Sequence, residues 1–460
     1  MLFNSYTFLF YFLPFFLLVY FALLKKWNNT TLAVFSYIFY GWNEPYYLVL
    51  LLSSTLIDYY IARKIPDSTN KKKLLFISIF LNLGMLCFFK YYHFFVQNWN
   101  AFTAFTEPGL SIENIWAFAV PIGISFYTFQ SMSYSIDVYR GDIKPEENFL
   151  DFACFVSMFP QLIAGPILRY GELKSSLKER MVSKTLISIG IAYICSGLFR
   201  KVVLGDSCGF IADVTFGTEG LSSLHAWFGL IAFSFQIYFD FAGYSDIAIG
   251  LGYILGFKFP ENFNSPYKAS SLTDFWHRWH ITFSTWLRDY LYIPLGGNKL
   301  GNTRTLINLF IVMFLGGLWH GASWNFVLWG ICHGLFLGIE RATGINKSES
   351  FLGIIRTFLL VSLMWVFFRS ANFEEAINYF SSLFGLGFKE QSILITSDLM
   401  SLWNVSIILV SAIACFACES SRSFVKELNA VKAVYLIILL LVSILFIYEF
   451  DNRLFIYFRF

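Results

Sequence analysis

The six histidines carry most of the acid–base chemistry that this sequence offers. His320 ends a long apolar run and is flanked by small residues, among them Gly316, Gly317 and Gly321. Small residues allow close backbone packing and can line a cavity. A neutral imidazole in such a low-dielectric site is a competent general base, and histidine also forms interhelical hydrogen bonds in membranes. His320 is therefore a candidate catalytic residue, with a structural role as the alternative.

Two more histidines lie in the segment 270–298, SSLTDFWHRWHITFSTWLRDYLYIPLGGN, which is too polar to cross lipid. Ser271 followed by Asp274 is typical of a helix N-cap. A single helix continuing from there, at about 100° per residue, places His280 on an aromatic arc and His277 on the polar side. We expect an amphipathic or re-entrant helix in which His280 is buried and chemically relevant, whereas His277 is a polar-face residue.

No metal site is expected from the histidines. A His-x-x-His motif such as His277 with His280, without a nearby cysteine or carboxylate cluster, is weak evidence of metal ligation. A membrane haem or metal protein that also used His320 is the alternative. His333 follows in the apolar run 305–340; one continuous helix would place it about 220° round from His320, so we expect His333 to be structural.

Two carboxylates, Asp240 and Asp246, lie inside an apolar run. Ionisable residues at membrane depth are costly and usually pair or face a wet cavity. We expect structural ion pairs with Arg200 or Lys201. The alternative is proton coupling, together with His320, in a transporter or flippase of a lipid-linked sugar; we find no inverted sequence repeat, which counts against it.

The elements that must position these residues are membrane helices. The chain is 57% hydrophobic and only 14% charged, with a net charge of +3, and its mean hydropathy is +0.60. A soluble domain is about 25% charged. Apolar runs recur from end to end and predict an all-α polytopic membrane protein with about 11 transmembrane helices in one domain, residues 1–460. Lysine and arginine lie in short loops, so no nucleic-acid partner is expected.

Basic loops predict the orientation of the chain, since positively charged loops stay in the cytoplasm. The basic stretches are Lys25–Lys26, 62–73, 168–180 and 422–432. Both termini are therefore predicted outside, with an aromatic tail over residues 449–460 on the outer face. The tail contains RLFIYFRF, although exposed chain ends are usually polar. From composition alone, Tyr457 in this stretch is an interfacial aromatic anchor.

Long motifs of the sequence resemble the membrane-bound O-acyltransferase (MBOAT) superfamily. FWHRWHITFSTWLRDYLYIPLGGN and GGLWHGASWNFVLWGICHG carry the superfamily signature. The resemblance to its bacterial polysaccharide-acetylating branch, which acts on alginate and peptidoglycan, is carried by VPIGISFYTFQSMSYSIDVYRG, FPQLIAGPILRY and FDFAGYSDIAIGLGYILGFKFPENFNSPY. Teichoic acid D-alanylation uses a more distant relative.

This resemblance implies a fold, a donor and a catalytic pair. The fold is the MBOAT fold, a ring of tilted helices and re-entrant helices around a central tunnel. His320, in the W-H-G motif, is the essential catalytic residue, and His280, in the R-W-H motif, is the second member. The donor is cytoplasmic acetyl-CoA, used as a substrate. The sequence has no glycine-rich phosphate loop that would identify its site.

The resemblance also implies a role for the tail and a cellular setting. Members of the branch share an aromatic C-terminal motif whose tyrosine, Tyr457 here, is proposed to take the acyl group before a partner collects it. The implied partner is a periplasmic or extracellular SGNH-type O-acetyltransferase or an acetyl-acceptor protein. The implied location is the bacterial cytoplasmic membrane, and D-alanyl or other acyl transfer is the alternative within the family.

Overall fold

The computed structural model is helical throughout the part of the chain that it describes. It describes residues 1–107, 110–113, 120–344, 350–390, 392, 396, 398–449 and 453–459, and these contain no strand. Five helices are long and apolar enough to cross a bilayer: Lys71–Thr106, Lys184–Phe216, Asn302–His320, Phe351–Arg369 and Ala430–Tyr448. Two shorter apolar helices cover Phe8–Ala22 and Leu402–Phe416. The chain is thus an all-α polytopic membrane protein, whereas the number of crossings and the single domain stay predictions.

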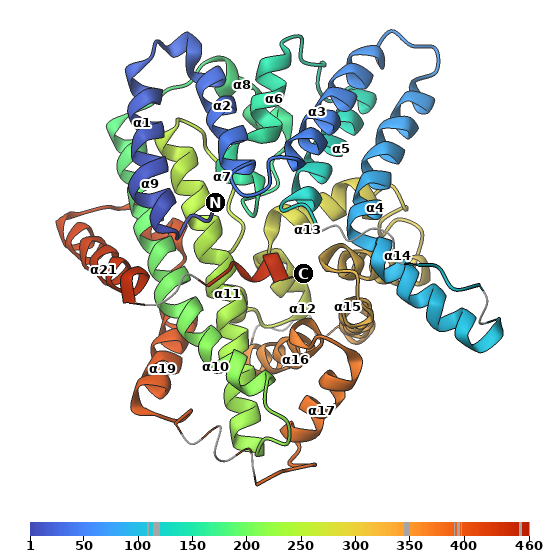
Figure 1. Ribbon diagram of the computed structural model, residues 1–460, viewed down its shortest axis with the longest axis vertical. Helices are drawn as coiled ribbons and strands as arrows, with labels where there is room; N and C mark the ends of the chain where they lie inside the picture. The colour runs from blue at the N-terminus through green and yellow to red at the C-terminus, as the bar shows by residue number, and fades with distance from the viewer. Residues whose placement is uncertain are drawn as a thin grey trace. The chain divides into compact units, whose positions relative to one another are not determined.

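Two compact units make up the chain, one of residues 1–183 with 255–258, the other of residues 184–254 with 259–460. The first contains the π-helix η1 (Phe8–Phe12) and the helices α1 (Leu13–Ala22), α2 (Asn28–Tyr40), α3 (Tyr47–Lys64), α4 (Lys71–Thr106), α5 (Ile124–Arg140), α6 (Phe149–Ser157), α7 (Phe159–Leu162) and α8 (Tyr170–Lys178) (Figure 1). Phe159 packs edge-on against Phe12 and Phe16, with ring centroids 5.5 and 5.1 Å away. Aromatic packing therefore holds α7 against the first helices.

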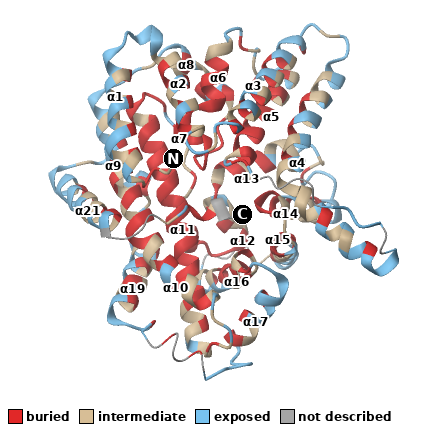
Figure 2. Cartoon of the chain, viewed as in Figure 1, coloured by how far each residue is buried: buried red, intermediate tan, exposed pale blue. Residues whose placement is uncertain are grey.

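The second unit is built around α11 (Ser223–Ile254), which is buried along most of its length (Figure 2). Beside it lie α9 (Lys184–Leu198), the π-helix η4 (Phe199–Gly205) and α10 (Asp206–Phe216). The α9 and α11 backbones touch, since a Cβ on Gly243 would lie 2.6 Å from the carbonyl oxygen of Gly197. This approach buries the carboxylates of α11 next to the cations of η4.

The main helices that follow α11 make up the rest of this unit, and several of those over residues 272–369 contact the buried histidines. These main helices are α12 (Leu272–Arg278), α13 (Ile281–Leu287), the π-helix η6 (Arg288–Tyr292), α14 (Asn302–His320), α15 (Trp324–Thr343), α16 (Phe351–Arg369), α17 (Phe373–Leu383), α19 (Leu402–Phe416), α20 (Ser421–Lys426), α21 (Ala430–Glu449) and the 3-10 helix η8 (Ile456–Arg459). Helices α14 and α15 are in backbone contact, because a Cβ on Gly317 would lie 2.3 Å from the carbonyl oxygen of Phe326.

The prediction of one helix through His280 is wrong. The helix that begins at the predicted cap, where the Ser271 hydroxyl accepts from the Asp274 N–H at 3.1 Å, ends at Arg278. His280 then adopts a left-handed conformation with φ 44°. The cause is a distant loop: the Ile281 N–H donates to the carbonyl of Asn262, and the Asn264 N–H donates to the carbonyl of Arg278, both at 2.9 Å.

The run 305–340 is likewise two helices and not one. Gly321 is extended after His320, and the Ser323 hydroxyl caps the new helix by accepting from the Asn325 N–H at 3.3 Å. His320 and His333 therefore lie on different helices, and the expected angle of 220° between them does not apply.

Candidate active site

His320 is the last residue of α14 and lies inside an aromatic cage. Its side chain is 3% exposed. Five rings surround it, with centroids 5.0 to 5.6 Å from the imidazole: Trp319, Trp329, Phe368, Phe283 and Tyr457. These rings come from α13, α14, α15, α16 and the tail, so the packing of all five segments determines the position of this imidazole.

His280 is fully buried at the break between α12 and α13, whereas His277 is exposed. The expected difference between the two histidines is therefore present, although the continuous helix from which we inferred it is not. The His280 ring lies 4.7 Å from Phe241 and 5.0 Å from Phe283. Burial lowers the pKa of His280 to about 3, so its imidazole is neutral at any physiological pH.

His333 makes a structural contact in α15. The Trp276 indole N–H donates to its Nδ1 at 3.2 Å, and the side chain is fully buried. Among the described residues there is no group of three or more histidine, cysteine, aspartate or glutamate side chains with metal-site geometry. His277, His280 and His320 in particular do not converge on one point, because His277 is exposed and the other two are buried.

Tyr457 contacts both candidate catalytic regions. Its ring lies 5.6 Å from His320 and 4.4 Å from Phe241, which in turn contacts His280. Phe455 stacks on it at 5.5 Å. The Tyr457 hydroxyl oxygen is buried, and burial raises its pKa above the ordinary value, so the phenol is neutral. The structure thus brings together His320 and the one tail hydroxyl that the sequence marked.

The expected ion pairs of Asp240 and Asp246 are confirmed. Lys201 Nζ lies 2.6 Å from Asp240, and Arg200 lies 2.9 Å from Asp246. Ser421 also donates to Asp246 at 2.7 Å. Each carboxylate therefore has a permanent cation beside it, which offsets the cost of burying its charge.

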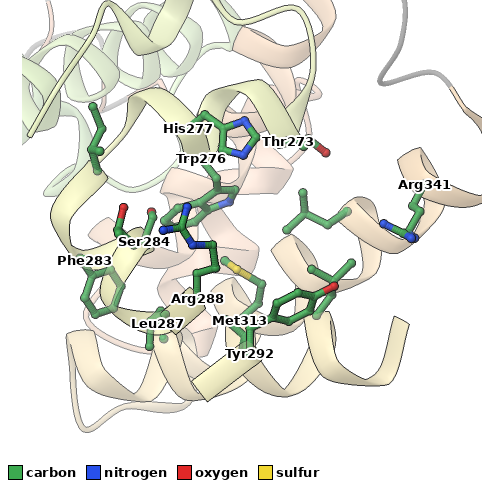
Figure 3. A pocket seen from close by; sticks show the side chains of 16 residues that line it. Thr273, Trp276, His277, Phe283, Ser284, Leu287, Arg288, Tyr292, Met313 and Arg341 are labelled. Carbon is green, nitrogen blue, oxygen red and sulfur yellow. The ribbon is translucent and has the colours of Figure 1, made fainter. Parts of the chain in front are cut away.

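A cavity of about 430 Å³ lies next to this site, and sequence spacing did not identify its lining, although many of those residues belong to the motif FWHRWHITFSTWLRDYLYIPLGGN. Its wall is mainly apolar, with Arg288, Tyr292 and Arg341 around it (Figure 3). Gly316 lines it one helical turn before His320, and Phe283 lines it while also touching the His320 ring. Residues from α12, α13, η6, α14 and α15 build the cavity, so only the fold assembles it.

The cavity and the tail approach His320 from opposite ends of the helices. Arg341 lies in the last turn of α15, near the end at which α16 begins. Phe368, one residue before the other end of α16, contacts Tyr457 at 6.3 Å and His320 at 5.2 Å. A mainly apolar cavity with arginines beside it and the phenol ring of Tyr457 thus both adjoin the His320 imidazole.

Comparison with known proteins gives matches over nearly the whole chain. The model of the membrane-bound O-acyltransferase family matches residues 142–379. A probable alginate O-acetylase AlgI of Pseudomonas syringae pv. tomato is 43% identical over 90% of this chain and 81% of its own length. The peptidoglycan O-acetyltransferase of Helicobacter pylori is 34% identical over 100% of this chain and 98% of its own. A teichoic acid D-alanyltransferase of Bacillus subtilis is 30% identical over 60% of this chain and 74% of its own.

Proposed function

Because the chain belongs to the membrane-bound O-acyltransferase family and is therefore an acyltransferase, we propose that it supplies acetyl groups for O-acetylation of a bacterial envelope or exported glycan. The names of its relatives support an alginate-type or peptidoglycan-type acceptor. A transporter is not proposed, because family membership makes the chain an enzyme. D-alanyl transfer is the second candidate, supported by the Bacillus subtilis relative.

The proposed donor is acetyl-CoA, bound from the cytoplasmic side in the cavity beside α14. Arg288 and Arg341 are cations that suit the phosphates of CoA, and the apolar wall suits its extended thiol arm. The thioester would reach Gly316, one turn from His320. In the orientation that the basic loops predict, both termini lie outside a bacterial cytoplasmic membrane, and the tail meets the donor from the outer side.

In the proposed chemical step, His320 accepts the proton of the Tyr457 hydroxyl as the phenol oxygen bonds to the thioester carbonyl carbon. The carbon–sulfur bond then breaks, the sulfur leaves with the electron pair, and the imidazolium returns the proton to it. The products are acetyl-Tyr457 and the free CoA thiol. General base catalysis of this kind contributes roughly 10²–10⁴-fold, and fixed geometry contributes more. His280 is the proposed second catalytic residue and adjoins this site through Phe241, whose ring contacts both His280 and Tyr457.

The observation that carries this proposal is the contact of the Tyr457 ring with the His320 ring at 5.6 Å. A phenyl ester is more activated than an alkyl ester, so a glycan hydroxyl or a partner nucleophile can attack the same carbonyl and return the phenol. We propose a periplasmic or extracellular SGNH-type transferase, or an acetyl-acceptor protein, as that partner. CoA itself carries several charges and need not cross the membrane.

The proposal is tested with the purified full chain in lipid nanodiscs, supplied with radiolabelled acetyl-CoA. The wild-type protein should acquire one acetyl group on Tyr457, located by mass spectrometry of its C-terminal peptide. Tyr457→Phe keeps the aromatic ring and should acquire none, and cells carrying it should lack ester-linked glycan acetate. If cells carrying Tyr457→Phe had a normal amount of ester-linked glycan acetate, Tyr457 would serve only as an interfacial aromatic anchor. If the wild-type protein is not acetylated by acetyl-CoA but is acylated on Tyr457 by a D-alanyl thioester, D-alanyl transfer would be indicated.

A further inference from the structure

The tail of the chain is held at two points on the unit that contains His320. At the first point, the Ile456 N–H donates to Asp240 Oδ2 at 2.6 Å. At the second, the Arg453 guanidinium donates to Asp213 Oδ2 at 2.7 Å. Tyr457 follows Ile456 directly, so these two bonds restrict where its ring can lie.

Each point of attachment is built from buried or half-buried charges. Lys201 has 0% side-chain exposure and lies 2.6 Å from both Asp240 and Asp206. Its Nζ also donates to the Arg453 carbonyl oxygen at 3.4 Å. Lys201 therefore orients the carboxylate that holds Ile456 and also contacts the tail backbone directly.

Asp213 completes the second point by bridging two arginines. Its Oδ1 accepts from Arg369 at 2.7 Å, while its Oδ2 accepts from Arg453 at 2.7 Å. Arg369 is the last residue of α16, directly after Phe368, which contacts both His320 and Tyr457. One end of α16 thus supplies both a wall of the site and an anchor for the tail.

If all six side chains of this group are counted as charged, the charges balance when the tail is in place. Lys201, Arg369 and Arg453 give three positive charges, and Asp206, Asp213 and Asp240 give three negative ones. Without Arg453 the same group carries two positive and three negative charges, a net of −1. A buried carboxylate without its full set of partners is costly, so the group favours the docked tail.

We propose that Lys201, Asp206, Asp213, Asp240 and Arg369 form a tail dock whose task is to hold Tyr457 against His320. Asp240 and Asp213 are positioning residues that act through Ile456 and Arg453. The residue after Asp240, Phe241, contacts the Tyr457 ring at 4.4 Å, so one turn of α11 orients both tail backbone and tail ring. The claim that the dock positions Tyr457 for acetyl transfer rests on the proposed function. The claim that the dock holds the tail does not.

Hydrogen–deuterium exchange of the full chain in nanodiscs tests the docking without any measurement of activity. Asp240→Ala removes the acceptor of Ile456 and leaves Lys201 paired with Asp206. Arg453→Gln changes a residue of the tail and leaves the five side chains of the dock themselves unchanged. Both should accelerate exchange in the peptide containing Ile456 by about tenfold, since each removes a charge-assisted hydrogen bond. Arg453→Lys should restore the protection.

The matched control is Asp246→Ala, which removes another buried carboxylate of α11, one that pairs with Arg200 and Ser421. It should leave exchange of the tail peptide unchanged. Dock variants should also slow acetylation of Tyr457 about tenfold in kcat, with the KM for acetyl-CoA unchanged, because the donor cavity is untouched.

Unchanged exchange of the tail in both Asp240→Ala and Arg453→Gln would overturn the dock. Accelerated exchange with an unchanged rate of Tyr457 acetylation would show that the contacts hold the tail without positioning the hydroxyl, and would also overturn the proposal. If wild-type protein never acetylates Tyr457 but the dock variants still release the tail, the dock stands and the acetyl relay fails.

Discussion

The imidazole of His320 and the phenol ring of Tyr457 lie 5.6 Å apart, centroid to centroid, inclined at 57°. One ends α14 and the other belongs to the tail, and both contact Phe368 of α16. An imidazole and a neutral phenol hydroxyl thus share one aromatic site. A neutral phenol is a poor nucleophile, so its contact with a base is what makes acyl transfer to Tyr457 chemically reasonable.

Replacing His320 should abolish acetyl transfer and leave the fold intact. His320→Gln keeps a polar side chain of similar reach but cannot accept a proton at neutral pH. We expect acetylation of Tyr457 to fall by roughly 10²–10⁴-fold, measured by mass spectrometry after incubation with acetyl-CoA. Tail exchange should stay at the wild-type level, which separates lost chemistry from lost docking. A wild-type rate in this variant would remove His320 from the mechanism.

The role of His280 can be tested with a substitution that tolerates the left-handed backbone conformation of this residue. Asparagine adopts the left-handed conformation more readily than most residues, whereas alanine does not. We therefore expect His280→Asn to melt close to the wild-type temperature and His280→Ala to melt lower, while both lose acetylation by about 10²-fold or more. Full activity of His280→Asn would show that this histidine is only a packing residue.

If the cavity beside α14 binds acetyl-CoA as proposed, variants of its arginines should change KM and not kcat. Arg288→Gln and Arg341→Gln should each raise the KM for acetyl-CoA about tenfold, because each removes a cation that meets phosphate before the reaction begins. Arg304→Gln, on α14 but outside the cavity lining, is the matched control. With acetyl-pantetheine, which lacks the nucleotide, the cavity variants should equal the wild type. An effect that persists with this short donor would contradict phosphate recognition.

Glu261 makes stability depend on pH. Burial raises its pKa to about 7 from an ordinary 4.5, although the nearby Arg422 opposes the shift. Between these values the folded protein retains a proton that the unfolded chain has released. The free energy of unfolding therefore falls as pH rises from 4.5 to 7. Glu261→Gln lacks this contribution, so its melting temperature should exceed that of the wild type at pH 8 and approach it at pH 4.5. An equal difference in melting temperature between variant and wild type at pH 8 and at pH 4.5 would contradict the raised pKa of Glu261.

Local patterns predicted local structure well. The Ser271 cap forms as expected, because a capping hydroxyl and the N–H it accepts from lie within one turn. The break at His280 was missed because it depends on bonds to Asn262 and Asn264, in a loop that precedes α12. The burial of His280 and the exposure of His277 were still expected correctly, although the continuous helix from which they were inferred is absent.

Part of the site was predictable because its residues lie in local sequence patterns. Long motifs marked His320, His280 and Tyr457 as residues of interest, and pairing rules marked Asp240. The joining of Arg288 and Arg341 around one cavity was not predictable from spacing, because the lining comes from five elements that only the fold brings together. The bond between Arg453 and Asp213 joins two residues that no sequence spacing relates, so only the folded chain reveals it.

Tyr457 and His320 belong to the same polypeptide chain. This has a kinetic consequence for the proposed acetyl transfer. A tethered nucleophile meets its base at an effective concentration of the order of millimolar, set by the length of the tether and not by the amount of protein. Self-acetylation should therefore be first order in enzyme, with the same half-time in sparse and in crowded membranes. A free peptide of the same sequence would have to exceed that concentration to compete, and only the later delivery to a partner would depend on how often two proteins meet.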